Sequence, residues 1–295
     1  MKRKINVKQP FPEKQLFKTA CFSLVFLMLV AATGAWAEPE LHTEKRIDWS
    51  KGELGISFTI YISGESDNPL NYRNTAESRI QQYLPIALQE ALAPLYADSF
   101  YTLADIMATD STFISRIEDI AESAVFESSH LSADLTKYEG KYTFSLYPDI
   151  LSIFNLHEVP LGIQPRLSWV PSADYTGLVI YMKGEYPVHG ENTTAELQPC
   201  FFPRIFDSEM NLIVSMEMMD PLFLKQWGVC GYTDSFKESP YLKRIGPAPL
   251  HASGTGIFGK NRTDIILTDS TADQLLYSEH NRELLKEGRI LIIIN

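Results

Sequence analysis

The chain has few cysteines and few basic residues, and it is short of positive charge overall. Three cysteines occur in 295 residues, and 26 Lys and Arg residues stand against 37 Asp and Glu residues, a net charge of −11. A body of this charge repels nucleic acid and anionic lipid headgroups, so we expect neither as a partner. The length is sufficient for one large domain or two modest domains, each with a buried core.

Recognisable catalytic motifs are also missing. The sequence contains no G-x-S-x-G elbow and no H-E-x-x-H helix, and its six histidines occur singly: His42, His130, His157, His189, His251 and His280. We therefore expect no catalytic residues, no cofactor and no metal ligands, and the sequence favours a protein that is not an enzyme. A dispersed hydrolase triad stays open as an alternative, because triads assemble in space and leave no fixed spacing.

One glycine-rich stretch matches two nucleotide-binding patterns in form. Gly254, Gly256 and Gly259 give G-x-G-x-x-G, and Lys260 follows, but Asn261 stands where a P-loop has Ser or Thr. Both patterns require the glycines to begin a helix that meets phosphate, whereas a strand pattern follows here. We predict a glycine-rich strand or loop that binds no nucleotide, with Gly256 at positive φ.

The first 37 residues have the pattern of a signal peptide. Six basic residues and one acidic residue precede the apolar run at residues 20–32, and Ala35-Trp36-Ala37 forms a small-residue cleavage site. We predict cleavage between Ala37 and Glu38, which leaves 20 basic against 36 acidic residues and no transmembrane segment. An uncleaved anchor is the alternative. The protein is expected to be exported, either periplasmic or associated with the outer membrane.

Two cysteines, Cys200 and Cys230, remain after the signal peptide is removed. In an oxidising compartment an even pair is most simply a disulfide, and the alternative is two buried free thiols. A metal site is not expected, because no histidine lies at zinc-ligand spacing from either cysteine.

Hydrophobic periodicity divides the mature chain into residues 38–159 and 160–295. Apolar residues alternate over residues 54–62 and again over 142–147, which predicts strands, and helical stripes cover residues 74–95 and 111–125. We expect Pro85 and Pro94 to kink or divide the first helix. The N-terminal part should therefore be a small strand–helix–helix–strand layer.

Strand patterns predominate after residue 160. Candidate strands cover residues 163–170, 177–183, 201–206, 212–216 and 264–268. A helical region at residues 270–288 then leads to the continuously apolar segment at residues 289–294, which should be a central strand. The predicted fold class is α+β, with a β-rich C-terminal part that closes as strand–helix–strand.

Three blocks in the C-terminal half resemble a bacterial envelope family of flagellar basal-disc and sheath-associated lipoproteins. These blocks are Tyr175–Gly184, Leu197–Asp207 and Arg244–Leu250, and the likeness covers roughly Tyr175–Asn295. The sequence departs from the family at Tyr181-Met182-Lys183 and has no lipidation cysteine. The resemblance implies a non-enzymatic envelope or motility-accessory protein, with other envelope or flagellar-accessory proteins as partners.

The sequence thus predicts an exported, non-enzymatic envelope protein with a structural or protein-interaction role, and a flagellar association is the narrower expectation. The alternative is a periplasmic hydrolase-like enzyme or a small-ligand-binding protein.

Overall fold

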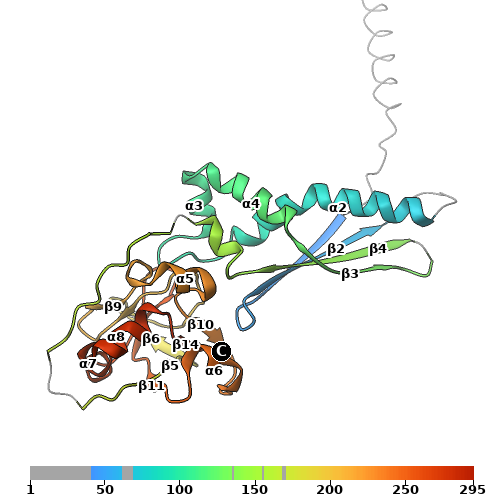
Figure 1. The fold of residues 1–295 in the computed structure, drawn as a ribbon. Helices are drawn as coiled ribbons and strands as arrows, with labels where there is room; N and C mark the ends of the chain where they lie inside the picture. The colour runs from blue at the N-terminus through green and yellow to red at the C-terminus, as the bar shows by residue number, and fades with distance from the viewer. Residues whose placement is uncertain (1–40, 62–68, 135, 155, 168–170) are drawn as a thin grey trace, which may run out of the picture. The chain divides into compact units, whose positions relative to one another are not determined.

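The computed structural model describes residues 41–295, except 62–68, 135, 155 and 168–170 (Figure 1). The fold is α+β, as predicted, with strands and helices in the N-terminal part and many short strands in the C-terminal part. The predicted signal peptide and its cleavage site at Ala37 and Glu38 lie outside the described residues. None of the helices in the described ranges is long and apolar enough to cross a membrane.

An antiparallel sheet of order β1-β2-β4-β3 forms the N-terminal part. Its strands are β1 (Leu41–Asp48), β2 (Glu53–Tyr61), β3 (Val125–Leu131) and β4 (Lys137–Ser145). The alternating Leu54, Ile56 and Phe58 are buried, and β2 pairs with both β1 and β4. The edge strands β1 and β3 were not predicted, because both are largely polar and show no regular apolar alternation.

Helix α2 (Pro69–Leu92) lies along one face of this sheet and contacts β2 and β4 (Figure 1). Helix α4 (Thr112–Glu122) packs against α2 and against the 3₁₀ turn η1 (Ile150–Ile153), and the short helix α3 (Leu103–Thr109) precedes it. The predicted stripes are confirmed, since Ile80 and Leu88 of α2 and Phe113 and Ile117 of α4 are buried. Pro85 does not divide the helix, because α2 runs through it, and the helix ends at Leu92, just before Pro94.

Two further sheets form the core of the C-terminal part. A parallel sheet of order β10-β14-β5-β11 contains β5 (Leu178–Tyr181), β10 (Gly231–Thr233), β11 (Leu250–Ser253) and β14 (Ile290–Ile293). The last strand is central, as predicted, and every residue of β14 is buried. A mixed sheet of order β12-β13-β8-β9 contains β8 (Ile205–Phe206), β9 (Leu212–Val214), β12 (Gly256–Phe258) and β13 (Asp264–Ile266).

Short elements complete the C-terminal part. They are the hairpin β6 (Glu185–Pro187) and β7 (Thr194–Glu196), the helices α5 (Pro221–Trp227), α6 (Leu242–Ile245), α7 (Asp269–Tyr277) and α8 (Glu279–Lys286), and the 3₁₀ turns η2 (Met216–Met218) and η3 (Ser239–Tyr241). The helical region predicted at residues 270–288 is therefore two helices. They meet at Ser278, whose hydroxyl accepts a hydrogen bond from the Asn281 N–H at the start of α8.

Two predicted strands are wrong or shortened. Residues 163–167 have no regular structure, and residues 168–170 lie outside the described ranges. The strand predicted at residues 201–206 is reduced to Ile205–Phe206. The backbone N–H groups of Phe201 and Phe202 donate instead to the carbonyls of Tyr96 and Ala97, so these aromatic residues join the two parts of the chain.

The glycine-rich stretch is a β-hairpin. Gly256 lies in β12, the chain turns at residues 259–262, and β13 follows antiparallel, so the glycines begin no helix. The prediction of a strand-and-loop structure is confirmed, but the residue with positive φ was misplaced. Gly259, and not Gly256, has a φ of +91°, and a Cβ there would lie 2.3 Å from the Ser99 Cβ.

The segment around Ser99 holds this hairpin to the N-terminal part. The Asn261 N–H donates to the Ser99 carbonyl at 2.9 Å, and the Asn261 side-chain amide donates to the Asp98 carbonyl at 2.9 Å. The buried hydroxyls of Ser99 and Thr263 are 2.8 Å apart. Buried polar groups are therefore satisfied across this contact, which fixes the N-terminal part next to the C-terminal sheets.

Candidate functional site

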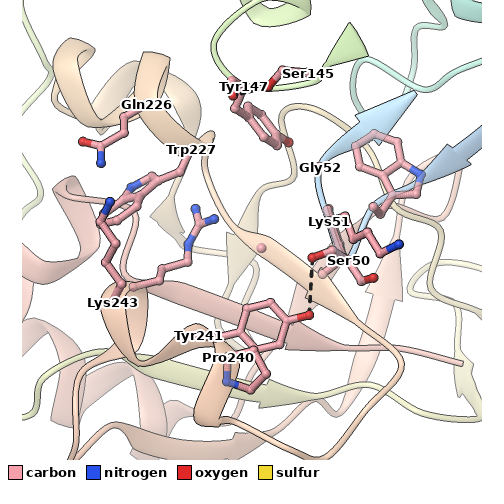
Figure 2. A pocket seen from close by; sticks show the side chains of 14 residues that line it. Ser50, Lys51, Gly52, Ser145, Tyr147, Gln226, Trp227, Pro240, Tyr241 and Lys243 are labelled. Atoms are coloured by element: carbon pink, nitrogen blue, oxygen red, sulfur yellow. Dashed lines mark hydrogen bonds between the residues drawn. The ribbon is translucent and has the colours of Figure 1, made fainter. Parts of the chain in front are cut away.

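A pocket of about 250 Å³ lies between the turn that joins β1 to β2 and the helices α5 and α6 (Figure 2). Its residues come from three separate segments, at positions 49–52, 145–147 and 226–244. Figure 2 shows Ser50 and Lys51 on one side, Trp227 and Lys243 on the other, and Tyr147 and Tyr241 between them. The pocket is slightly smaller than the usual range for drug-sized ligands, so it suits a small molecule or a small chemical group.

Asp48 positions the β1–β2 turn. Its carboxylate accepts hydrogen bonds from the Ser50 hydroxyl at 2.6 Å and from the backbone N–H groups of Ser50 and Lys51. The Ser50 hydroxyl is the main reason that the pKa of Asp48 lies below its ordinary value. The Tyr241 hydroxyl then donates to the Ser50 carbonyl at 3.4 Å, which joins the two walls of the pocket (Figure 2).

Arg244 on α6 is a buried cation with no acidic partner among the described residues. Its guanidinium donates from Nε to the Gly288 carbonyl at 2.8 Å and from Nη2 to the Gly228 carbonyl at 3.0 Å. It also lies over the Trp227 ring, 5.3 Å from the ring centroid. Burial lowers the pKa of Arg244 to about 10, so the side chain is still cationic at neutral pH.

Tyr147 contributes a buried hydroxyl that makes no hydrogen bond to any described residue. Its ring packs against Gly228, where a Cβ would lie 2.4 Å from the ring, and Gly228 also has a φ of +72°. Burial raises the pKa of Tyr147 well above its ordinary value, so the hydroxyl is a neutral donor. Buried polar atoms without a partner are uncommon in native proteins, and each needs an explanation.

The charged side chains of the pocket all have the same sign. Lys51, Lys243 and Arg244 line it, and no Asp, Glu, His or Cys occurs among the described residues that do so. Lys51 forms an ion pair with Asp48, with 3.7 Å between Nζ and Oδ2, but Asp48 itself does not line the pocket. The pocket is thus cationic in an acidic chain, and it has no carboxylate or imidazole to act as a general base near neutral pH.

The two cysteines lie close to this pocket as buried free thiols. The Tyr232 hydroxyl donates to the Cys200 carbonyl, accepts from the Cys200 N–H at 3.3 Å, and lies 4.0 Å from Cys200 Sγ. Burial raises the pKa of both thiols, to about 11 for Cys230, which makes both of them poor nucleophiles. The structure corresponds to the free-thiol alternative, and the Cys200–Cys230 disulfide stays a prediction for the oxidised protein.

The other candidate groups do not converge. Across the described ranges, no three His, Cys, Asp or Glu side chains are placed to hold a metal ion. Lys260, the last residue of the nucleotide-like pattern, is exposed in the hairpin turn and lies outside the pocket. No motif in the sequence indicated the pocket, because its walls come from segments far apart along the chain that carry no catalytic or binding motif.

The comparisons with known proteins match both parts of the chain. Residues 40–153 match the family model of the Treponema pallidum Tp0624 N-terminal domain. Residues 177–295 match the family model of the second domain of Tp0624. The chain is similar to two domains of Tp0624. No curated protein matches the chain.

These matches show that the resemblance to flagellar basal-disc and sheath-associated lipoproteins is wrong. The Tp0624 second-domain model covers nearly all of the residues on which that resemblance rested. The first and third of these blocks pack against each other: the Thr176 hydroxyl donates to the Ile245 carbonyl, and a Cβ on Gly177 would lie 2.6 Å from that same oxygen. Such contacts reflect how strands and loops of this sheet approach each other, and they carry no information about a flagellum.

Tyr147→Phe tests whether the unpartnered hydroxyl lowers the free energy of unfolding. Because the change removes a buried polar atom that has no partner, we expect the free energy of unfolding to rise by about 1 kcal/mol. Tyr232→Phe is the matched control, and it should lower this free energy by about 1 kcal/mol, since the Tyr232 hydroxyl bonds the Cys200 backbone. Urea denaturation measures both, and a loss of stability in Tyr147→Phe would show that the hydroxyl has a structural partner.

Proposed function

We propose that the protein is an exported, non-enzymatic binding protein of the cell envelope, and that the pocket at Tyr147 and Arg244 is its ligand site. The observation that carries this proposal is the buried Tyr147 hydroxyl, which faces a pocket and has no described partner. A bound ligand that accepts a hydrogen bond would satisfy it. The signal-peptide pattern of residues 1–37 supports export to the periplasm or the outer membrane.

The composition of the pocket supports binding rather than catalysis. Acid–base catalysis at neutral pH needs a group that titrates nearby, such as histidine or a shifted carboxyl, and the described lining contains neither. Its tyrosines and lysines suit recognition, because they donate hydrogen bonds and present apolar surface at the same time. The hydrolase-like alternative therefore has no support in this pocket.

A structural or protein-interaction role is the second candidate, and the edge strand β3 favours it. Val125 and Phe126 at the start of this strand are 66% and 46% exposed. An exposed edge strand with apolar side chains can pair with another chain. Loss of binding partners in a pull-down with Val125→Lys, under conditions where the protein stays folded, would support this role.

Gln226→Trp tests the ligand site without touching the core. Gln226 is exposed on α5 and lines the pocket, so an indole there should fill the space that a ligand needs. We expect protein isolated from its native envelope fraction to release a small molecule on denaturation, detected by mass spectrometry, and Gln226→Trp to release none. Lys225→Trp, on the same helix but outside the pocket, is the matched control and should release as much as the unmodified protein. Equal release from both variants, or no release from any form, would contradict the proposal.

A further inference from the structure

The charge of the pocket points to the chemical class of its ligand. The chain as a whole has 37 acidic against 26 basic residues, yet the described lining of the pocket has three cations and no acid. Random placement of charge on such a surface would favour acidic residues. A cationic cluster attracts anionic ligands, and no carboxylate occurs among the described lining residues to neutralise it.

Arg244 strengthens this argument because it is buried. Moving a guanidinium out of water is costly unless an opposite charge or a full set of hydrogen bonds compensates. Two backbone carbonyls take Nε and Nη2, but no described carboxylate is paired with the group. The remaining terminal nitrogen, Nη1, lies beside Gly231 of the lining, where a Cβ would be only 3.1 Å from it. The absence of a side chain at Gly231 leaves that nitrogen accessible from the pocket.

We infer that this pocket binds a small organic oxyanion, held by Arg244 and the Tyr147 hydroxyl, with Lys51 and Lys243 at the mouth. The inference rests on the proposed binding function and narrows it to one ligand class. A guanidinium and a phenol hydroxyl together match the acceptors of a carboxylate or phosphate group. The rings of Trp49, Trp227 and Tyr241 provide apolar walls for the organic part.

The size of the pocket limits that organic part. A volume of about 250 Å³ is below the usual range for drug-sized ligands, so one ring or a short aliphatic chain is the expected size. Carboxylate and phosphate groups can both accept hydrogen bonds from a guanidinium and a phenol hydroxyl. Comparing the affinities of one ligand of each kind therefore shows which group the pocket prefers.

Four phenyl probes of similar size test the inference by calorimetric titration of the purified native protein: benzoate, phenyl phosphate, benzamide and benzylamine. We expect benzoate or phenyl phosphate to bind at least about tenfold more tightly than benzamide, a difference of about 1.4 kcal/mol. Benzylamine, a cation, should not bind. The tighter of the two anions identifies carboxylate or phosphate as the preferred group.

Two lysine substitutions then locate the site without removing buried Arg244, whose loss could unfold the protein. Lys51→Gln with Lys243→Gln should weaken binding of the preferred anion by about threefold to tenfold, and added NaCl should weaken it further. Lys225→Gln is the control, because Lys225 is exposed on α5 but does not line the pocket, and it should change nothing. Circular dichroism of each variant checks the fold.

The outcomes separate this inference from the function on which it rests. If benzoate, benzamide and benzylamine bind with equal affinity and Gln226→Trp abolishes all three, the pocket binds ligands but does not select an oxyanion. This result would overturn the inference and support the proposed function. Anion binding that is the same in the double lysine variant would place the anion elsewhere and also overturn the inference. If no probe binds and Gln226→Trp releases as much ligand as the unmodified protein, both the inference and the proposed function are wrong.

Discussion

Gly259→Val is expected to lower the free energy of unfolding by about 3 kcal/mol or more. Its φ of +91° is strained for any residue with a Cβ, and a β-branched side chain is the worst case. The new Cβ would also lie 2.3 Å from the Ser99 Cβ and 3.1 Å from the Ser99 carbonyl oxygen. Ser99 cannot move away without breaking its hydrogen bonds to Asn261 and Thr263. The backbone strain and the steric clash should therefore both lower the stability.

Two controls separate the causes of this loss. Gly190 has a similar φ of +82°, but a Cβ there would meet nothing within 4 Å, so Gly190→Val measures backbone strain alone. Lys260→Ala, next to Gly259 and exposed, should change stability by no more than about 0.5 kcal/mol. Urea denaturation followed by circular dichroism gives all three values. Equal losses in Gly259→Val and Gly190→Val would show that the close contact with Ser99 is not made.

Ile292→Ala should destabilise the protein by about 2–5 kcal/mol. Ile292 is fully buried in β14 and lies between Tyr232 of β10 and Ile180 of β5. Truncation of a buried isoleucine removes apolar contacts and leaves a cavity, because the neighbouring strands cannot close around it. Thermal and urea unfolding measure the change.

Val125→Ala is the matched control for the core substitution. Val125 also begins a strand, but β3 is an edge strand and this side chain is 66% exposed. The expected change is within about 0.5 kcal/mol, as for ordinary surface positions. A loss below 1 kcal/mol in Ile292→Ala would contradict the central position of β14 in the parallel sheet.

The parts of the fold that the sequence predicted are those with regular apolar spacing. Ile56 and Phe58 alternate with polar neighbours and form a half-buried strand, and Phe113 and Ile117 mark the buried face of α4. The uninterrupted apolar run of β14 similarly indicated a central strand. In these segments local pattern and tertiary burial agree.

The errors occurred where tertiary contacts decide the structure. Phe201 looks like a strand residue, but its N–H binds the Tyr96 carbonyl in the N-terminal part. Pro85 can kink or divide a helix, and the division does not occur, because α2 continues through it and packs on the sheet. The edge strand β3 escaped detection because exposed edges need no apolar alternation.

The candidate site was missed for a related reason. Ser50, Tyr147 and Arg244 belong to segments far apart in the sequence, and none is part of a recognisable motif. Arg244 lies in one of the three blocks that resemble the envelope family, but that resemblance is wrong. Arg244 is a candidate binding residue because it is buried and has no acidic partner among the described residues, and both properties depend on the folded structure.

A crystal structure of the protein purified from its native envelope fraction tests the central claim most directly. The account predicts a small bound molecule in the pocket, with an acceptor atom within about 3 Å of the Tyr147 hydroxyl and an oxyanion beside Arg244. A pocket that contains only water, with the Tyr147 hydroxyl bonded to a protein group and a carboxylate of the chain paired with Arg244, would contradict it.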